Sequence, residues 1–482
     1  MRPDSFLAAL SVMLVLTVLQ RAIGLVRGIW FCHALDDAAL GQWAMGFGFL
    51  SLVTPMFLFG IPGSLPRFVE PHLQQGSLRT FLRQIFAATG ILALTCTSGL
   101  LLFPNRISAF VFGGIQSQPL VLCLALALAC TVLMLVTDEL LRGLRLIRLS
   151  SVVVCCQSLG FSLLGIACLE LGGGVPSLLV AFAAASLFAV LLGWWGLLRA
   201  NRSIPADHHS LAALALWRRI LPYALSIWWM NVLSNSFELT DRYMLLHLTP
   251  TGDEMGQRAV GQYHSGAIIP TVLISLSTMV GGILMPYLAA DWERDQRGEV
   301  FSRLRLAIAS VAVAFTAIAA ASILFAPLLY NFILAGRYEG ARQILPLCLI
   351  YAIWTSLAFI AQQHLFLIEK GRYAAYVLAV GLGINLALNA WWVPLWGLHG
   401  AVAATCISQL IVLCGILLAM HRTGFPFDLT VLWAILLPAT LLAGWEFALL
   451  CVILALFSNR QVRHALSRLW SMAGCQFAPL AK

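Results

Sequence analysis

Long apolar runs recur along the whole chain and constrain what it can fold into. A run of about 20 apolar residues is long enough to cross a bilayer as a helix. Of the 482 residues, 61% are hydrophobic and 10% are charged, whereas soluble domains carry about 25% charged residues. Strands of a membrane barrel alternate apolar and polar residues, and these runs are continuous. The sequence therefore predicts an all-α integral membrane protein without a soluble domain.

Fourteen runs are candidate transmembrane spans. They cover residues 6–30, 43–66, 84–103, 118–138, 149–171, 176–198, 220–247, 260–287, 305–330, 343–367, 373–394, 400–420, 428–443 and 444–458. The last two are short, and a single re-entrant hairpin is the alternative for them. We expect residues 459–482 to form a basic tail on the inner membrane surface.

The basic residues predict the orientation of these spans. With the N-terminus in the cytoplasm, 22 of the 29 basic residues fall in cytoplasmic connections and four in outer ones. The other three, Arg21, Arg27 and Arg242, fall within spans. Cytoplasmic loops are enriched in Lys and Arg, so we predict a multi-pass membrane protein with a cytoplasmic N-terminus.

An internal similarity divides the chain. Gly41-Gln-Trp43 opens the second span and Gly261-Gln-Tyr263 opens the eighth, 220 residues later. Because six spans separate them, both halves keep one orientation, as in a parallel repeat about an axis along the membrane normal. This predicts two six-helix lobes, residues 1–200 and 201–422, followed by two extra spans in 423–458 and the tail 459–482.

Ionisable residues within apolar spans are the candidate functional groups, because they are expensive at membrane depth unless they face protein or water. Arg21 and Arg27 lie in the first span. Glu238, Asp241 and Arg242 lie within five positions at the end of the run 220–247. Arg27 could line a cavity or reach the membrane interface with its long side chain.

Five sequence segments, in this order along the chain, carry a family resemblance. They are Gly60-Ile-Pro-Gly-Ser-Leu-Pro-Arg67; Leu141-Arg-Gly-Leu-Arg145; Pro222 with Thr240-Asp-Arg242; Ala335-Gly-Arg-Tyr338 with Ala341; and Asn385-Leu-Ala-Leu-Asn389 with Pro394, Gly397 and Gly400-Ala401. The series resembles the polysaccharide flippases of the multidrug/oligosaccharidyl-lipid/polysaccharide (MOP) exporter superfamily, the translocases of O-antigen and exopolysaccharide units. The resemblance covers nearly the whole chain.

The resemblance implies a transporter of the bacterial inner membrane, not an enzyme, with two lobes around a cavity that opens alternately to each side. It implies that an undecaprenyl-pyrophosphate-linked oligosaccharide is flipped from the cytoplasmic to the periplasmic leaflet. Related lipid II flippases carry cavity arginines on the first helix, a placement that Arg21 and Arg27 match. Those flippases also carry basic residues deeper in the second helix. Here the second span has none before Arg67, which argues against lipid II as the substrate.

For such a substrate we predict three groups of site residues. Arg21 and Arg27 would bind the pyrophosphate, since the guanidinium fork matches two oxygens at once, and Trp228 and Trp229 would stack on sugars. Gating or ion coupling would involve Glu238, Asp241, Arg242 and His264. An inner gate would include Arg67, Arg142 and Arg145, which also act as topology determinants.

Several structural alternatives remain open for these residues. Arg21 could be neutralised by an acidic residue, or pair with Asp241 when the outer side closes. Asp241 could instead form a structural pair with Arg242. Glu238 could pair with Arg242 at i, i+4, or carry a proton or sodium. His264 could be a buried imidazole without a transport role.

Two other functions compete with the flippase: a multidrug and toxin extrusion (MATE) antiporter and a membrane glycan polymerase or glycosyltransferase. The first would need mid-span carboxylates in the first lobe, and the second a large outer loop; the sequence has neither. The 12 cysteines show no metal-ligand spacing. We predict no cofactor or metal and no nucleic acid partner. The expected partners are the lipid-linked substrate, membrane lipids, a polymerase or glycosyltransferases, and a coupling ion, H⁺ or Na⁺.

Overall fold

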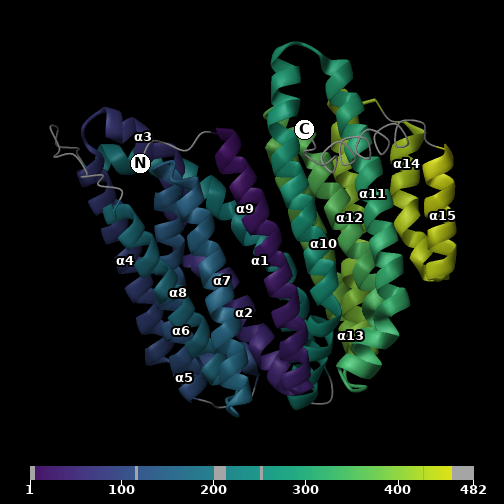
Figure 1. Ribbon diagram of the computed structural model, residues 1–482, viewed down its shortest axis with the longest axis horizontal. Helices are drawn as coiled ribbons and strands as arrows, with labels where there is room; N and C mark the ends of the chain where they lie inside the picture. Colours follow the sequence, from purple (N-terminus) through teal and green to yellow (C-terminus); the bar gives the residue numbers. More distant parts are fainter. Residues whose placement is uncertain (1–5, 114–117, 200–212, 250–252, 427, 459–482) are drawn as a thin grey trace, which may run out of the picture. The chain divides into compact units, whose positions relative to one another are not determined.

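The computed structural model describes residues 6–113, 118–199, 213–249, 253–426 and 428–458. Within these ranges every regular element is a helix (Figure 1), which confirms the predicted all-α class. The predicted basic tail, residues 459–482, lies outside the described residues.

Contacts divide the chain into two compact units, the first ending at Ser265 and the second beginning at Gly266, inside α10. Unit 1 contains α1 (Phe6–Ala34), α2 (Asp37–Phe57), η1 (Pro62–Ser64), α3 (Leu65–Gln74), α4 (Leu78–Leu102), α5 (Pro104–Phe112), α6 (Gln118–Gly143), α7 (Ile147–Glu170), α8 (Val175–Arg199), α9 (Ala213–Leu248) and the start of α10 (Asp253–Glu293). Unit 2 contains the rest of α10, α11 (Arg297–Pro327), η2 (Leu328–Ile333), α12 (Glu339–Leu367), α13 (Gly371–Arg422), α14 (Leu429–Leu436), η3 (Leu437–Ala443) and α15 (Trp445–Ser458). The predicted lobe boundaries follow the sequence repeat and remain predictions.

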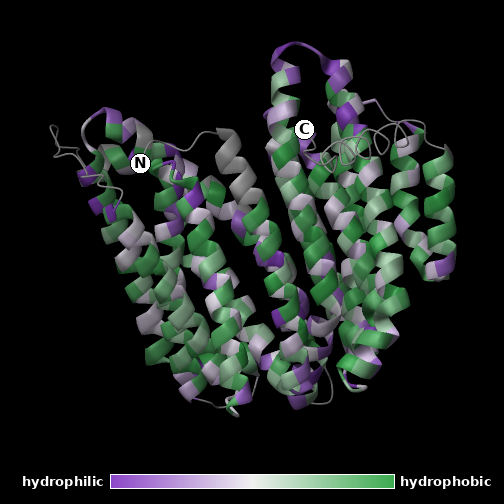
Figure 2. Ribbon diagram, viewed as in Figure 1, coloured by the Kyte–Doolittle hydropathy of each residue, from purple (hydrophilic) through white to green (hydrophobic). Residues whose placement is uncertain are grey.

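The outward faces of these helices are apolar. On α4, Ile91, Leu94 and Leu102 are 66%, 69% and 72% exposed. Figure 2 shows hydrophobic residues along the lengths of the helices and hydrophilic ones gathered toward their ends. So much exposed apolar surface would be unfavourable in water, and it fits hydrocarbon as the surrounding solvent.

Nine helices in the described ranges are long and apolar enough to cross a membrane, or ten if the bent pair Asp37–Phe57 and Pro62–Val69 is one span. The predicted fourteen spans all overlap helices, but three features lower the count. Asparagines and serines make α9 less apolar, α13 is counted once although its 52 residues contain two of the predicted spans, and α14 and α15 are short. Fourteen crossings therefore remain a prediction.

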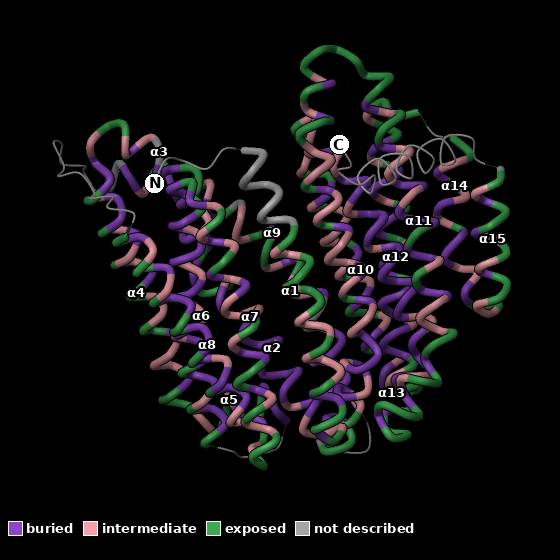
Figure 3. Tube along the Cα trace, in the orientation of Figure 1, coloured by how far each residue is buried: buried purple, intermediate pink, exposed green. Residues whose placement is uncertain are grey.

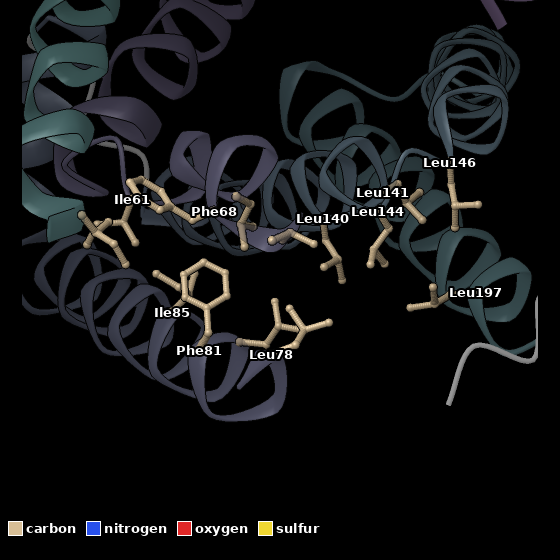
Figure 4. Close-up of a cluster of buried hydrophobic side chains, with 14 of the residues drawn as sticks. Ile61, Phe68, Leu78, Phe81, Ile85, Leu140, Leu141, Leu144, Leu146 and Leu197 are labelled. Carbon is tan, nitrogen blue, oxygen red and sulfur yellow. The ribbon is translucent and has the colours of Figure 1, made fainter. Parts of the chain in front are cut away.

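The core of unit 1 includes a cluster of buried side chains from α3, α4, α6, α7, α8 and α9. Figure 4 shows members of it, among them Phe68, Phe81 and Leu141. Figure 3 shows α6 largely buried, whereas α4 exposes one side. The cluster fixes α3 and the start of α9 to one end of the bundle.

A sharp bend ends α2, and α9 stabilises it. The axis turns by 64° between Asp37–Phe57 and Pro62–Val69, where Gly60 has φ +69°. A Cβ on Gly60 would lie 2.2 Å from the carbonyl oxygen of Ala224, so only glycine lets α9 approach this closely. The break removes the normal partner of the Met56 carbonyl, and the Trp228 indole N–H donates to that oxygen at 2.8 Å.

In unit 2, α13 is two helices joined at a tight turn. Gly397 has φ +54° and ψ −126°, outside the helical region, which separates the predicted spans 373–394 and 400–420. The two arms face each other through a buried polar contact. The Asn385 amide donates across the two arms to Thr405 Oγ1 at 3.3 Å, and within the first arm Asn389 donates to Asn385 Oδ1 at 3.1 Å. Such contacts join helices where water is absent.

Candidate functional site

Arg27 lies on α1 and packs against α7. Its Nη1 donates to the carbonyl of Ser158 at 3.5 Å and to Ser162 Oγ at 3.3 Å, and its Cζ lies 4.6 Å from the ring centroid of Phe161. A guanidinium over an aromatic face is stabilised by the ring quadrupole. No carboxylate is among the partners of Arg27 in the described part of the chain, so its positive charge is held by neutral groups.

Arg21 is exposed on α1 and forms no hydrogen bond or ion pair with any residue that the structure describes. It precedes Arg27 by six residues, which is about 9 Å along the helix and about 120° around it. The two arginines therefore leave α1 in different directions. The neutralising acidic partner considered for Arg21 is not found among the described residues, and its pairing with Asp241 in another state remains a prediction.

The charged end of α9 is buried. Asp241 and Arg242 are 1% and 4% exposed. Tyr263, at the start of α10, donates its hydroxyl to Asp241 Oδ2 at 3.0 Å, and Arg242 Nη1 donates to the carbonyl of Ala44 on α2 at 3.4 Å. On the same face of α2, a Cβ on Gly48 would lie 2.8 Å from Leu239 Cδ1, so glycine there lets α9 pack closely against α2. These groups tie α2, α9 and α10 together.

The two Gly-Gln segments of the internal similarity contact each other within unit 1. A Cβ on Gly41 would lie 2.0 Å from the carbonyl oxygen of Gln257, and a Cβ on Gly261 would lie 1.9 Å from that of Asp37. Gly41 thus faces the backbone four residues before Gly261, and Gly261 faces the backbone four residues before Gly41. The crossing of α2 and α10 is therefore reciprocal. Gln262 also donates to the Asp37 carboxylate. Glycine at such crossings allows two helix backbones to approach closely.

The side chain of Glu238 lies outside the described residues, so its predicted coupling role remains a prediction. His264 follows Tyr263 and is half-buried. Its Nδ1 is buried without a hydrogen-bond partner among the described residues. A gating role for His264 also remains a prediction.

Two of the predicted inner-gate residues, Arg142 and Arg67, have different contact partners. Arg142 Nη2 pairs with Asp138 Oδ2 at 2.7 Å, one turn earlier on α6, and Asp138 also accepts a hydrogen bond from Ser150 on α7. Arg145 follows α6 with φ +58°. Arg67, on α3, instead stacks over the ring of Tyr223 on α9, with Cζ 4.5 Å from the centroid. The Arg142–Asp138 pair lies within α6, so Arg142 stabilises the end of its own helix.

Trp228 and Trp229 have different surroundings. The Trp228 ring lies 5.8 Å from Phe59 and 5.9 Å from Trp229, and its N–H is bonded to Met56. Trp229 is 50% exposed. Trp228 therefore supports the bend in α2, and the exposed ring of Trp229 is the freer of the two for a sugar.

We expect Trp228→Phe to lower the free energy of unfolding by about 0.5–1.5 kcal/mol, the net value of one hydrogen bond. The phenyl ring keeps the stacking but cannot donate to the Met56 carbonyl. Chemical denaturation in detergent micelles would measure this, with Trp229→Phe as the matched control. Equal losses in both variants would contradict the assignment.

Sequence reasoning missed three participants: Tyr263, Asp37 and Arg219. Tyr263 belongs to the repeated Gly-Gln segment, which signals equivalence between halves but not contact. Asp37 lies four residues before Gly41, so the carbonyl it presents to Gly261 was recognisable only after the helices were placed. Arg219 was only one of the 22 basic residues counted in the cytoplasmic connections, yet its Cζ lies 5.8 Å from the ring centroid of Phe68 on α3.

The comparisons with known proteins agree with this architecture. The model of the family described as "Polysaccharide biosynthesis protein" matches residues 6–292, more than half of the chain. No curated protein matches the sequence. A structure of the lipid II flippase MurJ in an inward closed conformation is similar, with TM-score 0.70 and 13% identity, over 94% of this chain and 99% of that one.

Transporters of the MATE family share the fold as well. An inward-facing structure of a multidrug resistance MATE transporter of the MOP superfamily gives TM-score 0.67 at 16% identity, over 86% of this chain and 99% of that one. An outward-facing structure gives 0.60 at 16% identity, over 86% and 97%. The chain therefore belongs to the polysaccharide biosynthesis protein family and has the fold of the MOP exporter superfamily, as its motifs predict.

Proposed function

We propose that this protein is a flippase that moves an undecaprenyl-pyrophosphate-linked oligosaccharide from the cytoplasmic to the periplasmic leaflet by alternating access. One observation carries the proposal. Arg21 and Arg27 lie in a span of a polysaccharide biosynthesis protein, and neither has a carboxylate partner in the described part of the chain. Cations at membrane depth without counter-ions attract an anionic headgroup.

The chemistry of the substrate explains why such arginines are useful. A pyrophosphate and a glycan cannot cross about 30 Å of hydrocarbon without losing hydrogen-bond partners and stranding charge. Arginine stays charged and binds two phosphate oxygens at once. In this mechanism Arg21 binds the pyrophosphate directly, and Arg27, held by α7, contributes a fixed positive field beside it.

The fold also supports a second candidate, a drug antiporter, because MATE transporters share it. Cationic drugs would be repelled by Arg21 and Arg27. One carboxylate of unit 1, Asp241, is buried and already accepts a hydrogen bond from Tyr263. These features favour the anionic substrate.

The test is transport in proteoliposomes that contain a fluorescent lipid-linked oligosaccharide. We expect Arg21→Gln to lower the flipping rate about tenfold to a hundredfold, because charge-assisted hydrogen bonds contribute about 1.5–3 kcal/mol. Arg21→Lys should retain part of the rate. Arg106→Gln, which removes a charge stacked near Phe103 outside the site, is the matched control.

Efflux of a cationic dye from the same vesicles separates the two candidates. Dye efflux together with an unchanged rate of lipid flipping in Arg21→Gln would overturn the flippase proposal. Lipid flipping that falls in Arg21→Gln, with no dye efflux, would support it.

A further inference from the structure

A pocket at one end of unit 1 combines two arginines with aromatic rings. It has a volume of about 260 Å³ and is lined by Arg67, Phe68, Pro71, Arg219, Pro222 and Tyr223. The first three residues belong to α3 and the last three to α9. The volume is well above the ~30 Å³ of one water, so the pocket has room for a phosphate group.

The aromatic rings hold both guanidinium groups in place. Arg67 Cζ lies 4.5 Å from the centroid of Tyr223, and Arg219 Cζ lies 5.8 Å from that of Phe68. Phe68 and Tyr223 themselves meet edge to face at 5.8 Å. Phe68 belongs to the buried core cluster and Tyr223 packs against it, so the rings are fixed before any ligand arrives. Such preorganisation lowers the entropy lost on binding.

The N–H donors of both arginines are unused within the described part of the chain. The side chain of Glu70 is not among the described residues. Neither Arg67 nor Arg219 forms a hydrogen bond or ion pair there, and both side chains are exposed. A cation–π contact uses the face of the guanidinium and leaves its N–H groups free for phosphate oxygens.

His72 adds no charge to the pocket. It is buried on α3, beside Ser77 and stacked on Phe81. Burial, and then the positive charge of Arg219, lower the pKa of His72, so its imidazole is neutral at pH 7. The positive charge comes from the two arginines alone among the lining residues.

The helix that carries Arg67 is amphipathic. On α3, Leu65, Phe68 and Val69 are buried whereas Arg67 and Gln74 are exposed. A short amphipathic helix after a sharp bend in an apolar helix is typical of the membrane interface, and that is the depth at which lipid headgroups lie. Pro71, Pro222 and the ring edges supply apolar contact beside the charges.

We propose that this pocket binds the phosphate-bearing headgroup of a lipid, as the first docking site of the transported substrate before it reaches the arginines of α1. This inference rests on the proposed function for the identity of the substrate. In this proposal Arg67 binds the headgroup and is not a gate residue. Arg219 also binds the headgroup, in addition to its effect on the orientation of the spans. Arginine pairs of this kind bind phosphate oxygens in a fixed fork geometry.

Binding to the purified, full-length protein in nanodiscs of neutral lipid tests the site without transport. The probes are farnesyl pyrophosphate, inorganic pyrophosphate and farnesol. We expect Arg67→Gln and Arg219→Gln each to weaken farnesyl pyrophosphate binding about tenfold, and the double variant about a hundredfold, because each removes charge-assisted hydrogen bonds. Arg199→Gln is the matched control, since Arg199 stacks over Trp195 and lies outside the pocket.

The probes also separate the two sources of phosphate. Tighter binding of farnesyl pyrophosphate than of inorganic pyrophosphate would support a lipid headgroup, and equal binding of the two would overturn that assignment. Unchanged affinity in a folded double variant would overturn the site itself. Tyr223→Leu, which removes the stacking and no charge, should weaken binding by less than either arginine variant.

Failure of the binding test for this pocket can be told apart from failure of the proposed flippase function. Loss of farnesyl pyrophosphate binding in the double variant supports the site even if the native protein flips no lipid-linked oligosaccharide. Normal flipping by the double variant, with unchanged binding, would refute the site alone.

Discussion

Replacing Gly41 and Gly261 together with alanine is expected to force α2 and the start of α10 apart and to destabilise the protein. The added methyl groups would lie 2.0 and 1.9 Å from carbonyl oxygens, far inside van der Waals contact. Backbone atoms cannot turn aside as a flexible side chain can, so the helices themselves must move. Overpacking of this kind costs about 1–3 kcal/mol per site. A lower midpoint of thermal unfolding in detergent would report it.

Gly99→Ala is the matched control for this experiment. A Cβ on Gly99 meets nothing within 4 Å, and alanine favours a helix interior over glycine by roughly 0.5–1 kcal/mol. The control should therefore be neutral or stabilising. If the double variant melted at the temperature of the native protein, the reciprocal crossing would be refuted. We also expect the double variant to flip lipid more slowly than Gly99→Ala, because the polar contacts beside the crossing would be broken.

The second large effect is expected at Asp241 and Tyr263. Asp241→Leu removes the acceptor of the buried Tyr263 hydroxyl and leaves it without that partner. An unsatisfied buried polar group costs about 1–3 kcal/mol. Tyr263→Phe removes a donor from a carboxylate that is 1% exposed, and a hydrogen bond to a charged group contributes about 1.5–3 kcal/mol. Chemical unfolding in micelles measures both losses.

A double-mutant cycle isolates the contact itself. The loss in the Asp241→Leu/Tyr263→Phe protein should be smaller than the sum of the single losses, by roughly 0.5–3 kcal/mol, because contacting residues couple. Tyr243→Phe is the control. Tyr243 lies two residues after Asp241 and contacts Phe110 and His247 through its ring. Additive losses at 241 and 263, or an equal loss at 243, would show that the hydroxyl–carboxylate bond contributes little.

Much of the fold could be predicted because apolar length is a local property. The runs around 118–138 and 343–367 became α6 and α12, since a membrane span needs little more than about 20 apolar residues. Two glycines of the family motifs lie where helices break: Gly60 at the bend after α2, and Gly397 at the turn in α13. The number of crossings was harder to predict, because α9 mixes polar residues into an apolar run.

The site was less predictable because it depends on which helix faces meet. Arg27 was recognised as a membrane-depth charge, but nothing in the sequence marked Ser158, Phe161 and Ser162 as its neighbours. Periodicity gives the faces of each helix and not the pairing between helices. The Gly-Gln similarity came closest, since it identified both partners of the crossing without showing that they touch.

The bend of α2 has a mechanical consequence. In a straight helix the Met56 carbonyl would accept from the amide of Gly60; in the bent one it accepts from the indole of Trp228. The Met56 oxygen thus exchanges a donor within α2 for a donor on α9. If α2 straightened, Trp228 would lose its acceptor, and if α9 moved away, the Met56 oxygen would lose its donor. One hydrogen bond therefore couples the bend of α2 to the position of α9.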